Sequence, residues 1–179
     1  MRSSIAVSMA AGTLCACLVG CAGWQAWLDP KEAARLAKLY GPTADQRIEE
    51  LHERSEKAAK AGEQEAFGRE LTVAIIEEHD PRVRGEIVSL AGHIDSPQAR
   101  GVCEGGLVDP DPSVRMAACR AWAEKGGDRA VELLAQRIDG EQDIDVRLEA
   151  VAALGRTRSS KAIPHLAESL EDSDPAVQY

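Results

Sequence analysis

This sequence has few aromatic residues, no surplus of basic charge and no strand pattern. Aromatic residues make up 3% of its 179 positions, and 21 Lys and Arg residues stand against 30 Asp and Glu residues, a formal net charge of −9. Proteins that bind nucleic acids need a basic surface for the phosphates and aromatic rings for base stacking. We therefore expect no nucleic acid among the partners. The alternation of apolar and polar residues that predicts β-strands is also absent, so the expected fold class is all-α.

Motifs of enzyme chemistry are missing as well. The sequence has no glycine-rich phosphate loop and no HExxH pattern, and its four histidines include no pair at the spacing of metal ligands on one helix. The acidic stretch from Asp139 to Asp145 lacks the ligand order and the central glycine of an EF-hand calcium loop. We predict no catalytic residue, no cofactor and no metal.

What the sequence does contain is a repeat that opens on an aspartate. Asp80-Pro81-Arg82-Val83-Arg84 recurs as DPSVR at 111–115 and as DIDVR at 143–147, and it begins again as DPAV at 174–177. The leading aspartates are 31, 32 and 31 residues apart. A fixed period of this length predicts a solenoid of stacked units. Apolar columns align without a gap: Ile87, Ala118 and Ala150; Val88, Cys119 and Val151; Ala91, Trp122 and Leu154; Ala99, Ala130 and Ala162; Cys103, Leu134 and Leu166; Leu107, Ile138 and Leu170.

Each unit is predicted to contain two helices. The aspartate suits the N-cap of the first helix, because its carboxylate accepts from the free N–H groups of the first turn, and the proline suits the first helical position. Glycines about twelve residues further on predict where the first helices end: Gly92, Gly126-Gly127 and Gly155. Second helices are expected to start at Ser96-Pro97, Asp128 and Ser159-Ser160. One helix pair cannot cover both of its apolar stripes, so neighbouring pairs must stack.

The Asp-Pro-x-Val-Arg opening, Ala153-Leu154-Gly155 and the Ala-Ile-Pro-x-Leu run from Ala162 to Leu166 resemble HEAT repeats, in the short bacterial form similar to phycobilisome lyases. The resemblance covers residues 80–179 and implies a right-handed α-α superhelix, an α-solenoid. It also implies a ladder of hydrogen bonds along the stack, in which Asp80, Asp111 and Asp143 partner Arg84, Arg115 and Arg147 as structural residues. Two positions depart from the pattern. Ile144 replaces a proline, and His165 occupies a column that is apolar elsewhere, where we interpret it as a hydrogen-bonded packing residue.

Residues 1–20 have the features of a bacterial export signal. Arg2 precedes an apolar stretch from Ile5 to Val19 that is too short for a convincing membrane span. Leu18, Val19, Gly20 and Cys21 resemble a lipobox, which implies cleavage before Cys21 and lipidation of its sulfur. Several acyl chains on one residue would anchor the chain to a membrane, with the outer membrane or the periplasmic face as the expected location. The alternatives are an ordinary secretory signal cleaved elsewhere and an uncleaved anchor helix.

Cysteine usage agrees with an exported, lipid-anchored chain. Cys15 and Cys17 would leave with the signal and Cys21 would carry the lipid, so only Cys103 and Cys119 remain, both in apolar columns. We expect buried thiols that behave as small apolar side chains, with a disulfide between neighbouring helices as the alternative.

The remaining segments complete the expected domain organisation. After the signal peptide (1–20) comes an anchor-proximal linker (21–42) with a short helix from Pro30 to Tyr40. A capping αα-hairpin (43–79) follows, with helices from Thr43 to about Ala61 and from Glu63 to Glu78. It is expected to cover the open face of the first repeat, as the terminal units of solenoids do. The repeats occupy 80–110, 111–142, 143–173 and, in part, 174–179. We expect a longer chain or another element to cover the apolar side of the third unit.

These features predict a membrane-anchored, non-catalytic scaffold for protein–protein interactions in the cell envelope. An extended solenoid face binds a protein partner more naturally than a small molecule, although this step rests on the fold alone. The residues expected to select the partner are Arg82, Glu86, Ser113, Arg120, Glu124 and Glu149. The alternative from the phycobilisome-lyase resemblance is a bilin lyase or isomerase, an activity on a cytoplasmic pigment protein that does not fit the lipobox.

Overall fold

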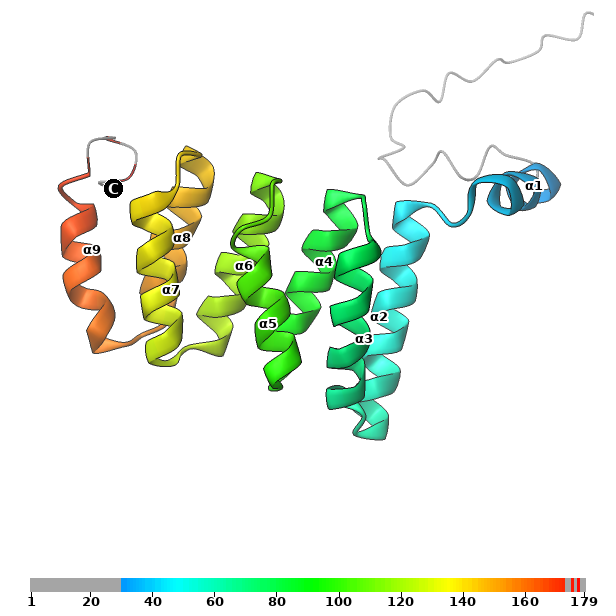
Figure 1. The fold of residues 1–179 in the computed structure, drawn as a ribbon, viewed down its shortest axis with the longest axis horizontal. Helices are drawn as coiled ribbons and strands as arrows, with labels where there is room; N and C mark the ends of the chain where they lie inside the picture. The colour runs from blue at the N-terminus through cyan, green and yellow to red at the C-terminus, as the bar shows by residue number, and fades with distance from the viewer. Residues whose placement is uncertain (1–29, 173–174, 176, 178–179) are drawn as a thin grey trace, which may run out of the picture. The chain divides into compact units, whose positions relative to one another are not determined.

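The computed structural model describes residues 30–172, 175 and 177, and every regular element among them is a helix (Figure 1). The chain divides after Gly41 into two compact units. The first contains α1 (Pro30–Tyr40), which is the predicted short helix. The second contains the other described helices and is the solenoid. The predicted export signal and the predicted lipobox lie outside the described residues.

The solenoid consists of helix pairs that follow one another in a row (Figure 1). The pairs are α2 (Ala44–Ala61) with α3 (Gln64–Glu77), α4 (Pro81–Gly92) with α5 (Pro97–Gly106), α6 (Pro112–Lys125) with α7 (Gly127–Gly140), and α8 (Ile144–Arg156) with α9 (Ile163–Ser169). The first helices α2, α4, α6 and α8 contact one another in that order and form one layer of the solenoid. Each second helix packs on the first helix of its own pair. The all-α solenoid expected from the repeats is therefore confirmed.

The predicted N-caps explain where the first helices begin. The carboxylates of Asp80, Asp111 and Asp143 accept the backbone N–H two residues further on, at 2.9, 2.9 and 3.0 Å. These bonds satisfy donors that no helix can pair within its own first turn. For α2 the hydroxyl of Thr43 accepts the backbone N–H of Gln46, three residues further on, and the Gln46 side chain accepts the N–H of Thr43, which completes a capping box.

Three boundaries differ from the prediction, and each has a local cause. Helix α8 continues through Gly155 to Arg156, because Thr157 hydrogen-bonds the carbonyls of Ala153 and Leu154 through its N–H and its hydroxyl. The left-handed residue that follows is Arg158, with φ of 53°. Helix α7 begins at Gly127 without a side-chain cap, one residue before Asp128. A 3₁₀ turn, η2 (Ser160–Ala162), precedes α9.

The aligned apolar columns form one continuous core. The valines that follow the N-caps, Val83, Val114 and Val146, are all buried, and Val177 occupies the same position in the next repeat and is also buried. The other columns are buried in the first two units. In the third unit Val151 and Leu166 are half-buried and Leu170 is 64% exposed. The third unit thus leaves apolar side chains of α8 and α9 partly open among the described residues. The element expected to cover them stays a prediction.

Two glycines of α5 give a matched pair for testing this packing. A Cβ at Gly106 would lie 2.9 Å from Cγ2 of Val88 and 3.0 Å from Cβ of Ala118, whereas a Cβ at Gly101 would meet nothing within 4 Å. We expect Gly106→Ala to lower the free energy of unfolding by about 1–3 kcal/mol through overpacking. Gly101→Ala should raise it by about 0.5–1 kcal/mol, because alanine has the higher helix propensity. Urea unfolding followed by circular dichroism measures both, and equal signs for the two variants would contradict the described contact.

Candidate interaction surface

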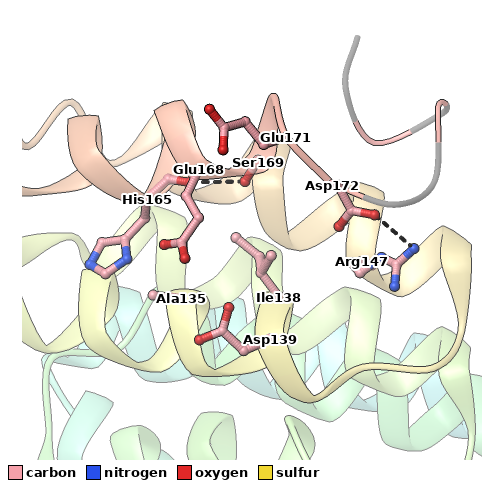
Figure 2. Close-up of a pocket in the computed structure, with 9 residues that line it drawn as sticks. All are labelled: Ala135, Ile138, Asp139, Arg147, His165, Glu168, Ser169, Glu171 and Asp172. Atoms are coloured by element: carbon pink, nitrogen blue, oxygen red, sulfur yellow. Dashed lines mark hydrogen bonds and ion pairs between the residues drawn. The ribbon is translucent and has the colours of Figure 1, made fainter.

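Every first helix carries an arginine four residues after its N-cap, and we call this set the arginine ladder: Arg47, Arg84, Arg115 and Arg147. Arg84 binds both carboxylate oxygens of Asp109 at 2.8 Å. Arg115 binds Glu141 in the same two-pronged way at 2.9 and 3.1 Å. Figure 2 shows the last of these ion pairs, in which Nη2 of Arg147 lies 3.4 Å from Oδ1 of Asp172.

The carboxylates of the ladder also hold the start of the next unit. Asp109 accepts the backbone N–H of Asp111 at 2.8 Å, and Glu141 accepts that of Asp143 at 3.0 Å. Each arginine therefore ties the first helix of its own unit to the N-cap of the following one. The ladder stabilises the stacking of the solenoid, and it leaves these guanidinium groups little freedom to bind a ligand.

The predicted partners of the ladder arginines were wrong. Asp80 and Asp111 act as N-caps of their own helices, whereas Arg84 and Arg115 reach forward to the carboxylate two residues before the next N-cap. Asp143 is likewise an N-cap, and the ion pair of Arg147 is with Asp172. The cause is geometric: an N-cap carboxylate faces the N–H groups of its own first turn. An arginine one turn further along points toward the neighbouring unit.

The α2–α3 pair, predicted as a cap, carries the same device. Arg47 binds Glu78 through Nε and Nη2 at 2.9 and 3.1 Å, and Glu78 accepts the N–H of Asp80 at 2.7 Å. The hairpin is therefore built as a further unit of the solenoid, and its predicted capping role stays a prediction. Its exposed face bears i,i+4 ion pairs such as Glu53 with Lys57.

Burial and hydrogen bonding act in opposite directions on the ladder carboxyls. Burial raises the pKa values of Glu78, Asp109 and Glu141, but the arginines and the backbone N–H donors outweigh it and hold each pKa below its ordinary value. These carboxylates are therefore charged at neutral pH. Their contribution to stability is present above the unfolded-state pKa, near 4, and is lost as the pH falls through the lower folded-state values.

The family model for HEAT repeats matches residues 69–147 and 131–179. The chain belongs to the HEAT-repeat family. No curated protein matches it. The family assignment agrees with the stacked helix pairs and makes the chain a helical-repeat scaffold for protein interactions.

The exposed side of the first HEAT helices carries an ion pair and a histidine–carboxylate contact that cross the boundaries between units. Arg82 on α4 lies 3.2 Å from Asp45 on α2, and His52 on α2 lies 2.9 Å from Glu86 on α4. We call this exposed side of α2, α4, α6 and α8 the first-helix face. All six residues expected to select a partner belong to these helices, and Ser113 donates its hydroxyl to Asp111 at 2.6 Å.

Three of the six come together on α6 and α8. Arg120 binds Glu149 at 2.8 Å across the unit boundary, and Glu124 lies 3.0 Å from His93, the C-cap of α4. Glu149 is half-buried and also pairs with Arg156 on its own helix. The sequence prediction missed Arg156 and Arg158, which lie near the same boundary.

A polar cavity of about 410 Å³ separates α7 from α9 (Figure 2). His165 and Glu168 of α9 both point toward α7 in this view. Oγ of Ser169 donates to the backbone carbonyl of His165 at 2.9 Å, but the imidazole has no hydrogen-bond partner among the described residues. His165 therefore lines this cavity and is half-buried, and the hydrogen bond predicted for its side chain is not found among the described residues.

The two cysteines among the described residues are buried. Cys103 and Cys119 are free, buried thiols, and burial raises their pKa values to about 11 and about 12. Such thiols are protonated at neutral pH and are poor nucleophiles. Within the described part of the chain, His, Cys, Asp and Glu side chains form no group of three that fits a metal ion. Among the same residues, no helix has the length and apolarity needed to cross a membrane.

Proposed function

We propose that the protein is a membrane-anchored scaffold of the bacterial cell envelope whose first-helix face binds another protein, without catalytic activity of its own. The observation that carries the proposal is that this face runs across consecutive units and is built from exposed ion pairs such as Arg82 with Asp45. Each exposed ion pair contributes only about 0–1 kcal/mol to stability. Its two side chains can therefore form contacts with a partner instead, with little loss of stability. The proposed anchor rests on the lipobox-like sequence from Leu18 to Cys21.

Crosslinking in intact cells followed by affinity capture tests the proposed face. We expect a specific protein to be recovered with the wild type and to be reduced about tenfold by Arg82→Glu, because a reversed charge on the face repels a matched partner group. Arg69→Glu is the matched control. It makes the same charge change at an exposed i,i+4 ion pair on α3, in the layer of second helices, and should leave recovery unchanged. Equal recovery with both variants would place binding elsewhere on the molecule.

Two further experiments test the proposed anchor and the proposed absence of catalysis. Cys21→Ser should move the protein from the membrane fraction to the soluble fraction, because no lipid can be attached. Recovery of the partner only with the anchored form would make membrane attachment part of the function. A linear tetrapyrrole mixed with the protein should give no new visible absorbance, whereas a bilin lyase would produce it.

A further inference from the structure

A groove of about 480 Å³ lies on the first-helix face between α6 and α8. Three guanidinium groups line it, those of Arg120, Arg156 and Arg158, together with Ala123 and two carboxylates, Glu124 and Glu149. The groove thus has a surplus of positive charge in a protein whose net charge is −9. A local surplus of this sign favours an anionic ligand at a surface that is otherwise acidic.

The backbone of Arg158 is the least expected feature of the groove. Its φ of 53° makes it the one non-glycine residue with positive φ among those the structure describes, where glycines hold the other positive values. The caps that end α2 and α6 are Gly62 and Gly126, with φ of 72° and 63°. A Cβ disfavours this conformation, so glycine is the usual residue there. An arginine at such a position gives up local stability and places a long cationic side chain at the end of α8, which indicates a role in binding.

Glu149 fixes the other two arginines. Its Oε2 accepts from Nε and Nη2 of Arg120 at 3.0 and 2.8 Å, and its Oε1 accepts from Nη2 of Arg156 at 2.5 Å. Nη1 of each arginine makes no hydrogen bond to a described residue, and the side chain of Arg158 makes none either. One half-buried carboxylate therefore orders two guanidinium groups and leaves donors on both of them unused. An anion in the groove would meet donors that are already oriented.

We propose that this groove binds a carboxylate-rich segment of the partner protein, with Arg158 as the arginine devoted to that contact. The proposal rests on the scaffold function proposed above and names the chemistry of the partner. The two carboxylates in the lining favour singly charged Asp and Glu side chains over a phosphate dianion, because each extra negative charge would be repelled by Glu124 and Glu149. Guanidinium forks match the geometry of carboxylates in two-pronged hydrogen bonds.

Titration calorimetry with a hexaglutamate peptide tests the groove directly. At 0.1 M salt the Debye length is about 10 Å, so the net charge of the chain is screened and the local arginines decide binding. We expect one peptide per chain, with an affinity that falls as salt is raised. Arg158→Gly should weaken binding at least about tenfold, because it removes charge-assisted hydrogen bonds. The same variant should leave the Tm unchanged or raise it, because glycine adopts a φ of 53° freely.

Two controls keep the test specific. Arg69→Gln removes one exposed arginine elsewhere on the solenoid and should leave the affinity unchanged. Arg158→Lys keeps the charge but lacks the planar fork, and should bind with intermediate affinity. Inorganic phosphate serves as the competing anion and should displace the peptide only weakly.

Several outcomes would overturn the proposal. Full affinity in Arg158→Gly, or an equal loss in Arg69→Gln, would show that the peptide binds through general electrostatic attraction and not through this groove. Tighter binding of phosphate than of the peptide would assign the groove to a phosphate-bearing ligand. If no peptide binds while capture of a partner still depends on Arg82, the acidic-segment proposal fails and the scaffold function stands.

Discussion

Arg115→Met is expected to lower the free energy of unfolding by about 3 kcal/mol at neutral pH, because it removes the main partner of a buried carboxylate. Glu141 is 7% exposed and receives two hydrogen bonds from Arg115. Nε of Arg137 lies 3.3 Å from the same carboxylate, which keeps the expected loss at the lower end of the range for broken buried ion pairs. Urea unfolding followed by circular dichroism at pH 7 measures the loss.

The pH dependence distinguishes this effect from a simple loss of packing. In the wild type the pKa of Glu141 is lower when folded than when unfolded, so the ion pair contributes above about pH 4 and fades as the pH falls through the folded-state pKa. Without Arg115 the burial of Glu141 is no longer outweighed to the same extent, and its folded-state pKa rises. The deficit of Arg115→Met relative to the wild type should therefore shrink between about pH 5 and pH 3.

Two further variants complete the test. Arg115→Met combined with Glu141→Gln should recover much of the lost stability, because the amide oxygen still accepts the N–H of Asp143 while the unpaired charge is gone. Arg69→Met breaks only an exposed i,i+4 pair and should cost less than about 0.5 kcal/mol. A deficit that stays constant down to pH 3 would show that the ladder does not depend on the charge of Glu141.

The carboxylates of the ladder were recognisable in the sequence, although the prediction passed over them. Glu78, Asp109, Glu141 and Asp172 are 31, 32 and 31 residues apart, the same periods as the leading aspartates. The column mixes Asp and Glu, so a search for identical residues favours the N-cap aspartates instead. Arg47 was not predicted as a member of the ladder, because its unit begins at Thr43 without the Asp-Pro pair and is longer than the others. Repeat periodicity therefore predicts the stacking, but assigning ion-pair partners needs the direction in which each side chain leaves its helix.

The groove is a feature that the aligned columns of the repeat do not predict. The prediction included Arg120, Glu124 and Glu149 as exposed residues, but their meeting point depends on how α6 and α8 are rotated about their axes. The position of Arg158 depends on where α8 ends. Thr157 determines that end, because it hydrogen-bonds carbonyls of the last turn. In the sequence Gly155 is the more obvious signal for the end of the helix, but α8 continues past it because the Thr157 hydroxyl caps the carbonyl of Leu154. The N-caps, the apolar columns and the period could be predicted because each depends on residues close together in the sequence, whereas the proposed partner-binding surface is formed by residues of neighbouring units.

Leu134→Asp is expected to abolish the cooperative fold altogether. Leu134 on α7 is fully buried in the continuous core, so the substitution removes a packed side chain and forces a carboxylate into apolar surroundings. The lost packing alone costs about 2–5 kcal/mol, and burial of the unpaired charge adds to it. Domains of this size are stable by only about 5–15 kcal/mol, so most of the chain should be unfolded at 25 °C. Far-UV circular dichroism should show the loss, with Gln136→Asp at an exposed position of α7 as the control.

The extent of the loss decides whether the solenoid behaves as one core. Helix α6 packs closely on α4, because a Cβ at Gly92 would lie 3.0 Å from Cβ of Ala121. If α6 and α7 unfold together, the face of α4 with Gly85 and Gly92 loses its contacts with Ala117 and Ala121 of α6 and becomes exposed to water. The two pairs α2–α3 and α4–α5 would then have to stand alone with that face uncovered, which we expect them not to do. Hydrogen exchange that remains slow in α2 to α5 of Leu134→Asp would contradict this and would make the repeats independent folding units.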